Sequence, residues 1–162
     1  MANPPKELLQ PSWEPLDLSR IEPKPKQIII DDLFVVQVLL NDRQERDYIT
    51  IRGLIRTGGD LGLYYRGSIT SDRLLKLLKV LHLHLGGPGS DAILYLIQYP
   101  EHVLFVRIDS HIHLKDIPPG NRLNMLGVKS FQVGLQAERV ERAKKLAEAK
   151  ARMISWLSKP KP

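Results

Sequence analysis

VLFVRIDSHIHL, at residues 103–114, decides the fold, because its side chains alternate between apolar and polar over most of its length. A period of two is typical of a β-strand. The predicted apolar face consists of Leu104, Val106, Ile108, Ile112 and Leu114. The predicted polar face consists of Arg107, Asp109, His111 and His113. The stretch therefore predicts a sheet with one buried and one solvated face.

Further strands are predicted on both sides of this stretch. Residues 28–40 are rich in Ile, Val and Leu and indicate a buried strand. Residues 48–52, YITIR, alternate, and the polar segment 41–46 before them predicts a hairpin turn. Residues 92–99 favour another strand, with a short helix as the alternative, and residues 128–133 are compatible with a further strand.

Two helices are indicated by spacing. The segment 70–85 begins with Thr-Ser-Asp, which are N-cap residues, and ends at Gly-Gly-Pro-Gly. On this helix His82 and His84 are two residues apart and would not face each other. Residues 135–157 predict a long amphipathic helix. Its apolar strip consists of Val140, Ala143, Ala147, Ala151 and Ile154. The small residues of this strip favour packing of the helix on the domain.

The chain is expected to be an α+β protein, with a mainly antiparallel sheet packed against two or three helices. Residues 1–27 contain six prolines and predict a flexible, extended arm. Residues 28–162 are expected to form one globular domain that includes the C-terminal helix. We expect the arm to mediate self-association through Trp13, flanked by Pro11 and Pro15.

The net charge of +6 is concentrated at the C-terminal end. Residues 134–162 hold eight basic and three acidic residues, a balance of +5. This end is therefore the predicted contact with phosphate groups of lipid or nucleic acid. The predicted binding residues there are Lys144, Lys150, Arg152, Lys159 and Lys161. The predicted alternative set, in the body of the domain, is Arg73, Lys76, Lys79 and Lys115.

Catalytic patterns are scarce in this sequence. The absence of cysteine excludes disulfides, zinc–thiolate sites and cysteine nucleophiles. The pair His111 and His113 on a strand could bind zinc. The amidohydrolase barrel in which such a pair occurs needs about 250 residues, and only 49 follow His113. We therefore expect no enzyme activity, no metal and no cofactor.

Three segments resemble the matrix proteins of rhabdoviruses, the plant-infecting members being closest in size. LFVVQVLL, residues 33–40, is similar to the opening strand of that domain. The segment 61–87, LGLYYRGSITSDRLLKLLKVLHLHLGG, resembles an aromatic-glycine turn and a basic helix. HIHLKDIPPGNRLNML, residues 111–126, is similar to a strand that ends in a proline-rich loop.

The resemblance implies a viral structural protein of the virion's inner layer. Such a protein would self-associate, bind the anionic inner surface of a membrane and contact the viral nucleocapsid, with host proteins as further partners. Its expected location is the virion and the host cytoplasm, peripheral to membrane, with the host nucleus as a further compartment. Two other classes stay open: a nucleic-acid-binding or host-interaction accessory protein, such as a silencing suppressor or movement factor, and a small metal-dependent hydrolase using His111 and His113.

Overall fold

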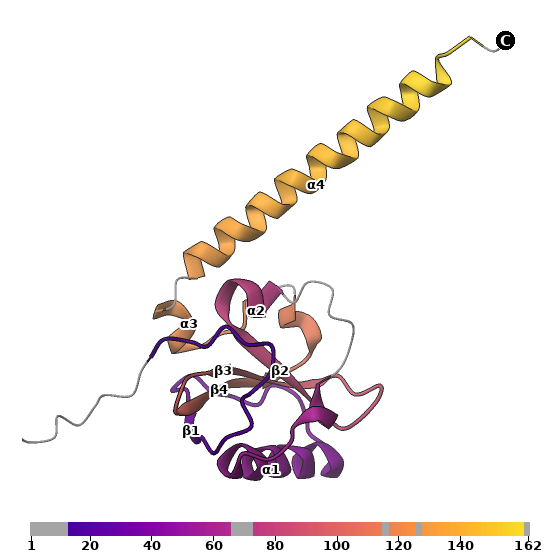
Figure 1. The fold of residues 1–162 in the computed structure, drawn as a ribbon. Helices are drawn as coiled ribbons and strands as arrows, with labels where there is room; N and C mark the ends of the chain where they lie inside the picture. The colour runs from indigo at the N-terminus through magenta and orange to yellow at the C-terminus, as the bar shows by residue number, and fades with distance from the viewer. Residues whose placement is uncertain (1–12, 66–72, 115–116, 126–127, 161–162) are drawn as a thin grey trace, which may run out of the picture.

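A mixed four-stranded sheet lies at the centre of the computed structural model, which describes residues 13–65, 73–114, 117–125 and 128–160 (Figure 1). Its strands are β1 (Gln27–Ile30), β2 (Val80–Leu85), β3 (Ala92–Gln98) and β4 (His102–Asp109). Their spatial order is β1-β4-β3-β2. The strands β2, β3 and β4 form an antiparallel meander, and β1 pairs with β4 in parallel.

Helices cover both faces of this sheet. The α-helices are α1 (Asp42–Thr57), α2 (Arg73–Leu78), α3 (Asn121–Met125) and α4 (Val128–Leu157). Short 3-10 helices are η1 (Gly62–Tyr64) and η2 (His111–Leu114). Figure 1 shows α1 below the sheet, with α2 and α3 above it. These layers confirm the expected α+β class.

Two apolar cores follow from the two covered faces. Ile51 and Ile55 of α1 pack against one face together with Phe105 of β4. Leu74 of α2 and Leu123 of α3 pack on the other face. The sheet is therefore buried on both sides, and the prediction of a solvated strand face is wrong.

A bulge in β4 changes which side chains share a face. Tyr95 of β3 lies opposite Arg107, and the next residue of β3, Leu96, lies opposite Phe105. Val106 is thus the extra residue of the bulge. Beyond it Ile108 joins the core of Phe105 instead of that of Val106. The strand also ends at Asp109, so His111 and His113 lie in η2 and not on a strand.

The predicted hairpin at residues 28–52 is a short strand followed by a helix. Asp31 accepts a hydrogen bond from the backbone N–H of Leu33 at 2.8 Å, which turns the chain directly after β1. The helix α1 then begins with a capping box, in which Asn41 and Gln44 each bond the other's backbone N–H at 2.9 Å. Ile51 and Ile55 are four residues apart and both buried, so helical spacing prevailed over the local alternation.

The helix predicted at residues 70–85 is also divided. The described part of it is α2, which ends at Leu78. Lys79 then adopts a left-handed φ of 59°, and β2 follows. His82 and His84 therefore lie on a strand and share one face, contrary to the helical prediction.

The expected strand at residues 128–133 is part of α4 instead. The helix spans 30 residues, from Val128 to Leu157, and begins seven residues before the predicted start. In the part of the chain that the structure describes, no helix is both long and apolar enough to cross a bilayer.

The proline-rich arm is described from Trp13 onward, and there it lies against the body. The backbone N–H of Leu16 donates to the carbonyl oxygen of Gln98 at 2.8 Å. The side chain of Gln98 is buried and bonds Glu22 N–H at 2.6 Å and the Arg20 carbonyl at 3.0 Å. Residues 13–26 are thus fixed to the end of β3, whereas Pro11 lies outside the described residues.

Candidate functional site

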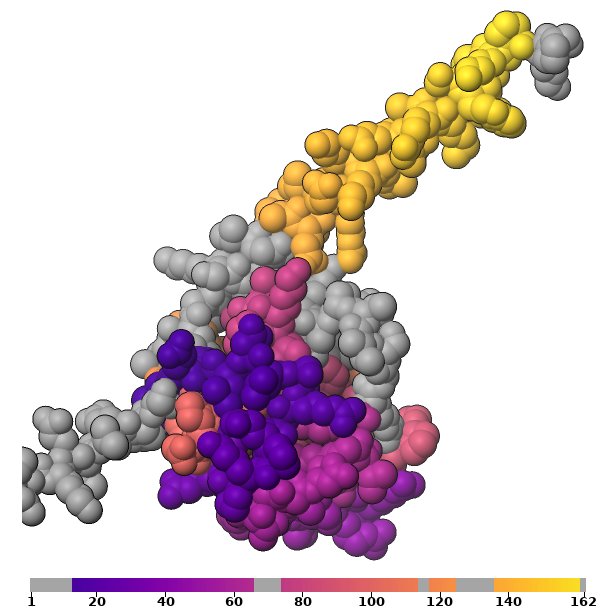
Figure 2. Space-filling view, viewed as in Figure 1, coloured from indigo at the N-terminus to yellow at the C-terminus, as the bar shows by residue number. Residues whose placement is uncertain are grey.

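The helix α4 leaves the folded body and extends away from it (Figures 1 and 2). Its main contacts with the body are with α2 and α3. Farther along, its side chains are exposed: the exposed fraction is 59% for Val140 and 65% for Ile154. The predicted packing of the apolar strip on the domain is therefore wrong in this structure.

An apolar stripe runs along the exposed part of α4. We define the stripe as Val140, Ala143, Leu146, Ala147, Met153, Ile154 and Leu157. At 100° per residue these positions fall within an arc of about 140°, so they share one side of the helix. An apolar helix face that is exposed to solvent is typical of a helix that binds a partner or a surface.

Three basic residues lie on or beside this stripe. Arg139 is four residues before Ala143, and Lys150 is four residues before Ile154, so both side chains project from the stripe itself. Lys144 is four residues after Val140 and borders it. Glu141 and Glu148 lie toward the opposite side of the helix. The net positive charge of the exposed part of α4 is thus greatest on its most apolar side.

The predicted C-terminal binding residues do not form one cluster. Lys144, Lys150, Arg152 and Lys159 are all exposed. Lys150 lies on the stripe, whereas Arg152 projects from the opposite side of the helix. Lys161 lies outside the described residues.

The alternative basic set in the body is only partly described. Lys76 is exposed on α2. The ammonium of Lys79 forms an ion pair with Asp17 at 2.9 Å, which reduces its availability for a ligand. Lys115 and the side chain of Arg73 lie outside what the structure describes.

Three histidine rings, those of His82, His84 and His111, lie next to one another near the ends of β2 and β4, an arrangement that the sequence interpretation missed. The ring of His84 lies 5.4 Å from that of His82 and 5.3 Å from that of His111. The ring of His113 meets Tyr95 edge-on at 5.9 Å. The alternation VLHLHL at residues 80–85 was the available signal, because a strand there places both histidines on one face.

Carboxylates hold the two histidines of η2. His111 bonds the side chain of Asp91, and this bond lowers the pKa of Asp91. His113 Nε2 lies 3.0 Å from Asp109, whose carboxylate also accepts from Arg107 Nε at 2.6 Å. Burial acts to raise the pKa of Asp109, but the bonds from Ser110, Arg107 and His113 outweigh it and lower that pKa.

These contacts tie η2 to the end of the sheet. The hydroxyl of Tyr95 donates to the carbonyl of Ser110 at 2.6 Å and closes the same turn. Across the described residues, no three His, Asp or Glu side chains are placed to hold a metal ion together. The arrangement accounts for His111 and His113 as structural residues.

A second aromatic group lies at the opposite end of the sheet. His102 stacks on Tyr99 with ring centroids 4.5 Å apart, and Trp13 meets His102 edge-on at the same distance. The guanidinium of Arg122 lies 4.0 Å from the centre of the Trp13 ring. Trp13 thus contacts its own body, with Pro15 half-buried nearby in sequence. Docking of Trp13 and Pro15 on a neighbouring molecule stays a prediction.

Lys26 completes this end of the sheet. Its buried ammonium donates to Glu22 at 2.9 Å and to the carbonyl oxygen of Tyr99 at 2.7 Å. Burial lowers the pKa of Lys26, and the hydrogen bond from Lys26 lowers the pKa of Glu22. The pair joins the end of the arm to the sheet.

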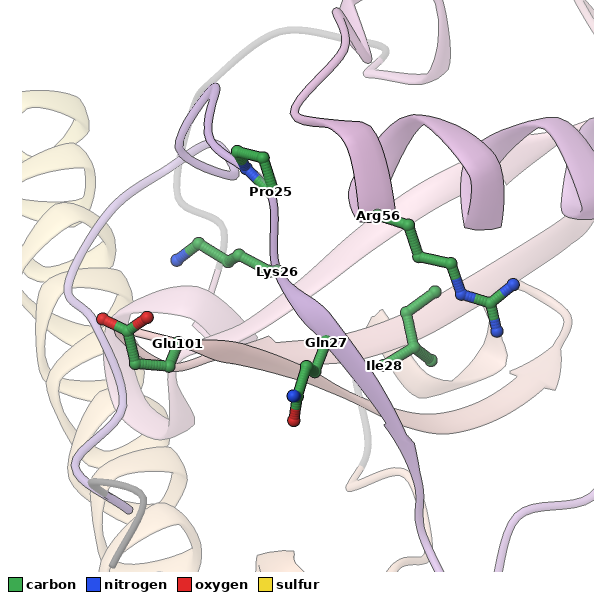
Figure 3. A pocket seen from close by; sticks show the side chains of 6 residues that line it. All are labelled: Pro25, Lys26, Gln27, Ile28, Arg56 and Glu101. Atoms are coloured by element: carbon green, nitrogen blue, oxygen red, sulfur yellow. The ribbon is translucent and has the colours of Figure 1, made fainter. Parts of the chain in front are cut away.

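An open hollow of about 600 Å³ lies beside β1, lined by Pro25, Lys26, Gln27, Ile28, Arg56 and Glu101. Figure 3 shows Lys26 and Arg56 extending to opposite sides of the strand. Their charges therefore do not converge on one point, and the hollow lacks the arrangement of a phosphate site. The surface of α4 is the stronger functional candidate.

Comparison with known proteins yields no relative of this chain. No family model matches it, and neither a curated protein nor a solved structure does. A proposal about function therefore rests on the surfaces described above.

Proposed function

We propose that this chain is a viral matrix structural protein, which self-associates and bridges the inner surface of a membrane to the ribonucleoprotein. The observation that supports this most directly is the position of α4. The helix extends beyond the body, exposes apolar side chains, and belongs to the segment that carries five of the six net positive charges. Such a helix can reach a surface that the body itself does not touch.

The physical basis of the membrane contact is electrostatic. A Lys or Arg near an anionic lipid surface contributes about 1 kcal/mol. The attraction decays over a Debye length of about 8 Å at physiological salt. Lys150 and Lys144 can place their charges among headgroups while nearby apolar side chains contact the acyl boundary. Ribonucleoprotein presents phosphates to the same basic side chains.

A binding role also fits the state of the histidines and carboxylates. Asp109 already accepts bonds from Arg107, Ser110 and His113, so its oxygens are engaged. His102 is buried, and burial lowers its pKa. These groups stabilise the ends of the sheet, and we propose no reaction for them.

The test is binding of the full chain to phosphatidylserine vesicles and to single-stranded RNA. Lys144, Lys150, Arg152 and Lys159 are replaced together by Gln. Because Lys144 and Lys150 lie at the stripe and each loses a contact of about 1 kcal/mol, we expect the affinity to fall about thirtyfold or more. Circular dichroism should show an unchanged fold, since all four side chains are exposed.

The matched control replaces four exposed arginines of the body, Arg20, Arg43, Arg46 and Arg56, by Gln. It removes the same charge and should leave most of the affinity. Equal losses in both variants would mean that only net charge matters and would overturn the role of α4. Binding to RNA alone, with no affinity for anionic vesicles, would favour the nucleic-acid accessory class instead.

A further inference from the structure

A second exposed apolar surface lies at the edge of the sheet. We define the sheet-edge segment as residues 30–39, from the end of β1 toward α1. Its exposed apolar side chains are Ile30, Leu33, Val35, Val36 and Leu39. Leu39 is 100% exposed. Apolar surface of this extent on an edge is rarely left open, because sheet edges invite association.

One side of this segment is fixed to β4. The N–H of Asp31 donates to Phe105 at 2.9 Å, and the N–H of Gln37 donates to Ile108 at 2.9 Å. Ile108 in turn donates to the carbonyl of Val35 at 3.0 Å. Phe34 and Val38 pack into the core, so the exposed side chains are held on a rigid support.

The charge of this edge is opposite to that of α4. The sheet-edge segment contains two aspartates, of which Asp31 is buried, and no lysine, arginine or histidine. Asp32 is exposed and lies in sequence between the exposed residues Ile30 and Leu33. The stripe of α4, in contrast, carries Arg139, Lys144 and Lys150. An acidic apolar surface and a basic apolar surface are thus present on one chain.

Pairing of two α4 helices through their stripes is disfavoured by charge. Such pairing would enclose Lys150 within the seam, with Arg139 and Lys144 of both copies nearby. Like charges in a closed apolar seam destabilise it. The stripe therefore fits an acidic surface better than it fits its own copy.

We propose that the stripe of α4 docks on the sheet-edge segment of a second copy of the chain. The proposal rests on the self-association within the proposed function and names its two faces. Both surfaces are exposed in a single molecule, so they do not satisfy each other within one chain. Because the two faces differ, each copy donates one stripe and accepts another, so the contact either closes reciprocally between two copies or continues head-to-tail into chains or rings.

The absence of cysteine in this protein allows a clean cross-linking test. Leu39→Cys and Ile154→Cys are made separately in the full chain, and both sites are exposed. A flexible bismaleimide is added to each variant alone and to their equimolar mixture. We expect a cross-linked dimer mainly in the mixture. Dimers from Ile154→Cys alone would indicate helix–helix pairing and overturn the proposal, as would absence of cross-linking in all three samples.

Charge reversal tests the pairing of the two faces independently. Asp32→Lys and Lys150→Glu should each weaken self-association about three- to tenfold in sedimentation velocity, because each places like charges across the contact. The double variant should regain at least half of the lost affinity. If the two losses simply multiply in the double variant, the faces do not meet, and the proposal fails.

The vesicle assay separates this inference from the proposed function. Asp32→Lys changes the body and leaves α4 intact, so it should keep its affinity for phosphatidylserine vesicles. Normal vesicle binding together with self-association that none of these substitutions weakens would overturn the docking inference alone. Absence of vesicle binding by the unmodified chain, with cross-linking retained, would overturn the membrane role in the proposed function and leave docking as the role of the stripe.

Discussion

Strand β3 and helix α4 are both rich in apolar residues, yet they lie in opposite environments. Every residue of β3 is buried, between α1 on one face of the sheet and α2 on the other. The described side chains of α4 from residue 136 onward are almost all exposed. β3 contains no charged residue, whereas 10 of the 30 residues of α4 are charged. The difference lies in whether the body supplies a covering layer, and for most of α4 it does not.

The largest expected effect is the difference in unfolding free energy between the same substitution, Ile→Ala, made in β3 and in α4. Ile93→Ala in β3 should lower the free energy of unfolding by about 2–5 kcal/mol, because it leaves a cavity in a fully enclosed core. Ile154→Ala in α4 should change it by less than about 0.5 kcal/mol at dilute concentration. Urea unfolding of both variants measures the contrast.

Comparable losses of unfolding free energy in the two variants would contradict the distinction between a buried β3 and an exposed α4. They would mean that α4 folds back on the body in solution. Repeating the experiment at a concentration where the chain self-associates adds a control, since only Ile154→Ala should then affect assembly.

A smaller effect is expected from two adjacent aspartates in the sheet-edge segment. Asp31 is buried and accepts from the N–H groups of Leu33, Asn121 and Arg122 at 2.8–3.2 Å. Asp31→Ala should cost about 2–3 kcal/mol, because it leaves these donors without their acceptor. Asp32→Ala is the matched control, since Asp32 is exposed, and it should be close to neutral in thermal unfolding. Equal effects would show that Asp31 does not hold α3 to the edge.

The smallest expected effect is a change in pH dependence at His102. Burial, together with Arg122 and Lys26, holds the pKa of His102 below its usual value. On acidification from pH 7 to 5 the unfolded chain therefore takes up a proton more readily than the folded chain, and stability falls. His102→Phe keeps the aromatic volume and removes this proton. Urea unfolding at both pH values should show a shallower loss in the variant, and an unchanged slope would contradict the assignment.

The elements that were predicted correctly from the sequence are those whose residues strongly favour one type of secondary structure. Residues 92–99 were expected as a strand, and β3 occupies all but the last of them. The end of the long C-terminal helix was also placed correctly, at Leu157. The segment YITIR at 48–52 was wrongly predicted as a strand because its apolar and polar residues alternate. The four-residue spacing of Ile51 and Ile55 fits a helix instead. The capping residues Asn41 and Gln44 were the signal that favoured the helix.

Site features were harder to predict, since they depend on tertiary neighbours. The basic residues of α4 could be identified from the sequence. No local pattern, however, shows whether the apolar strip of Val140 and Ile154 packs against the body or is exposed to solvent. The histidine group also needed the correct element for His82 and His84. Once these lie on β2, their approach to His111 follows from the meander.

The parallel pairing of β1 with β4 has a consequence for the order of folding. Gln27 lies opposite His102, so β1 has no strand partner until the chain has been synthesised well past that residue. Contacts of long sequence separation form slowly, because a long loop must close first. The meander β2–β3–β4 joins neighbours in sequence and can form without this closure. We therefore expect β1 to join last, which leaves the first part of the chain available to chaperones during translation.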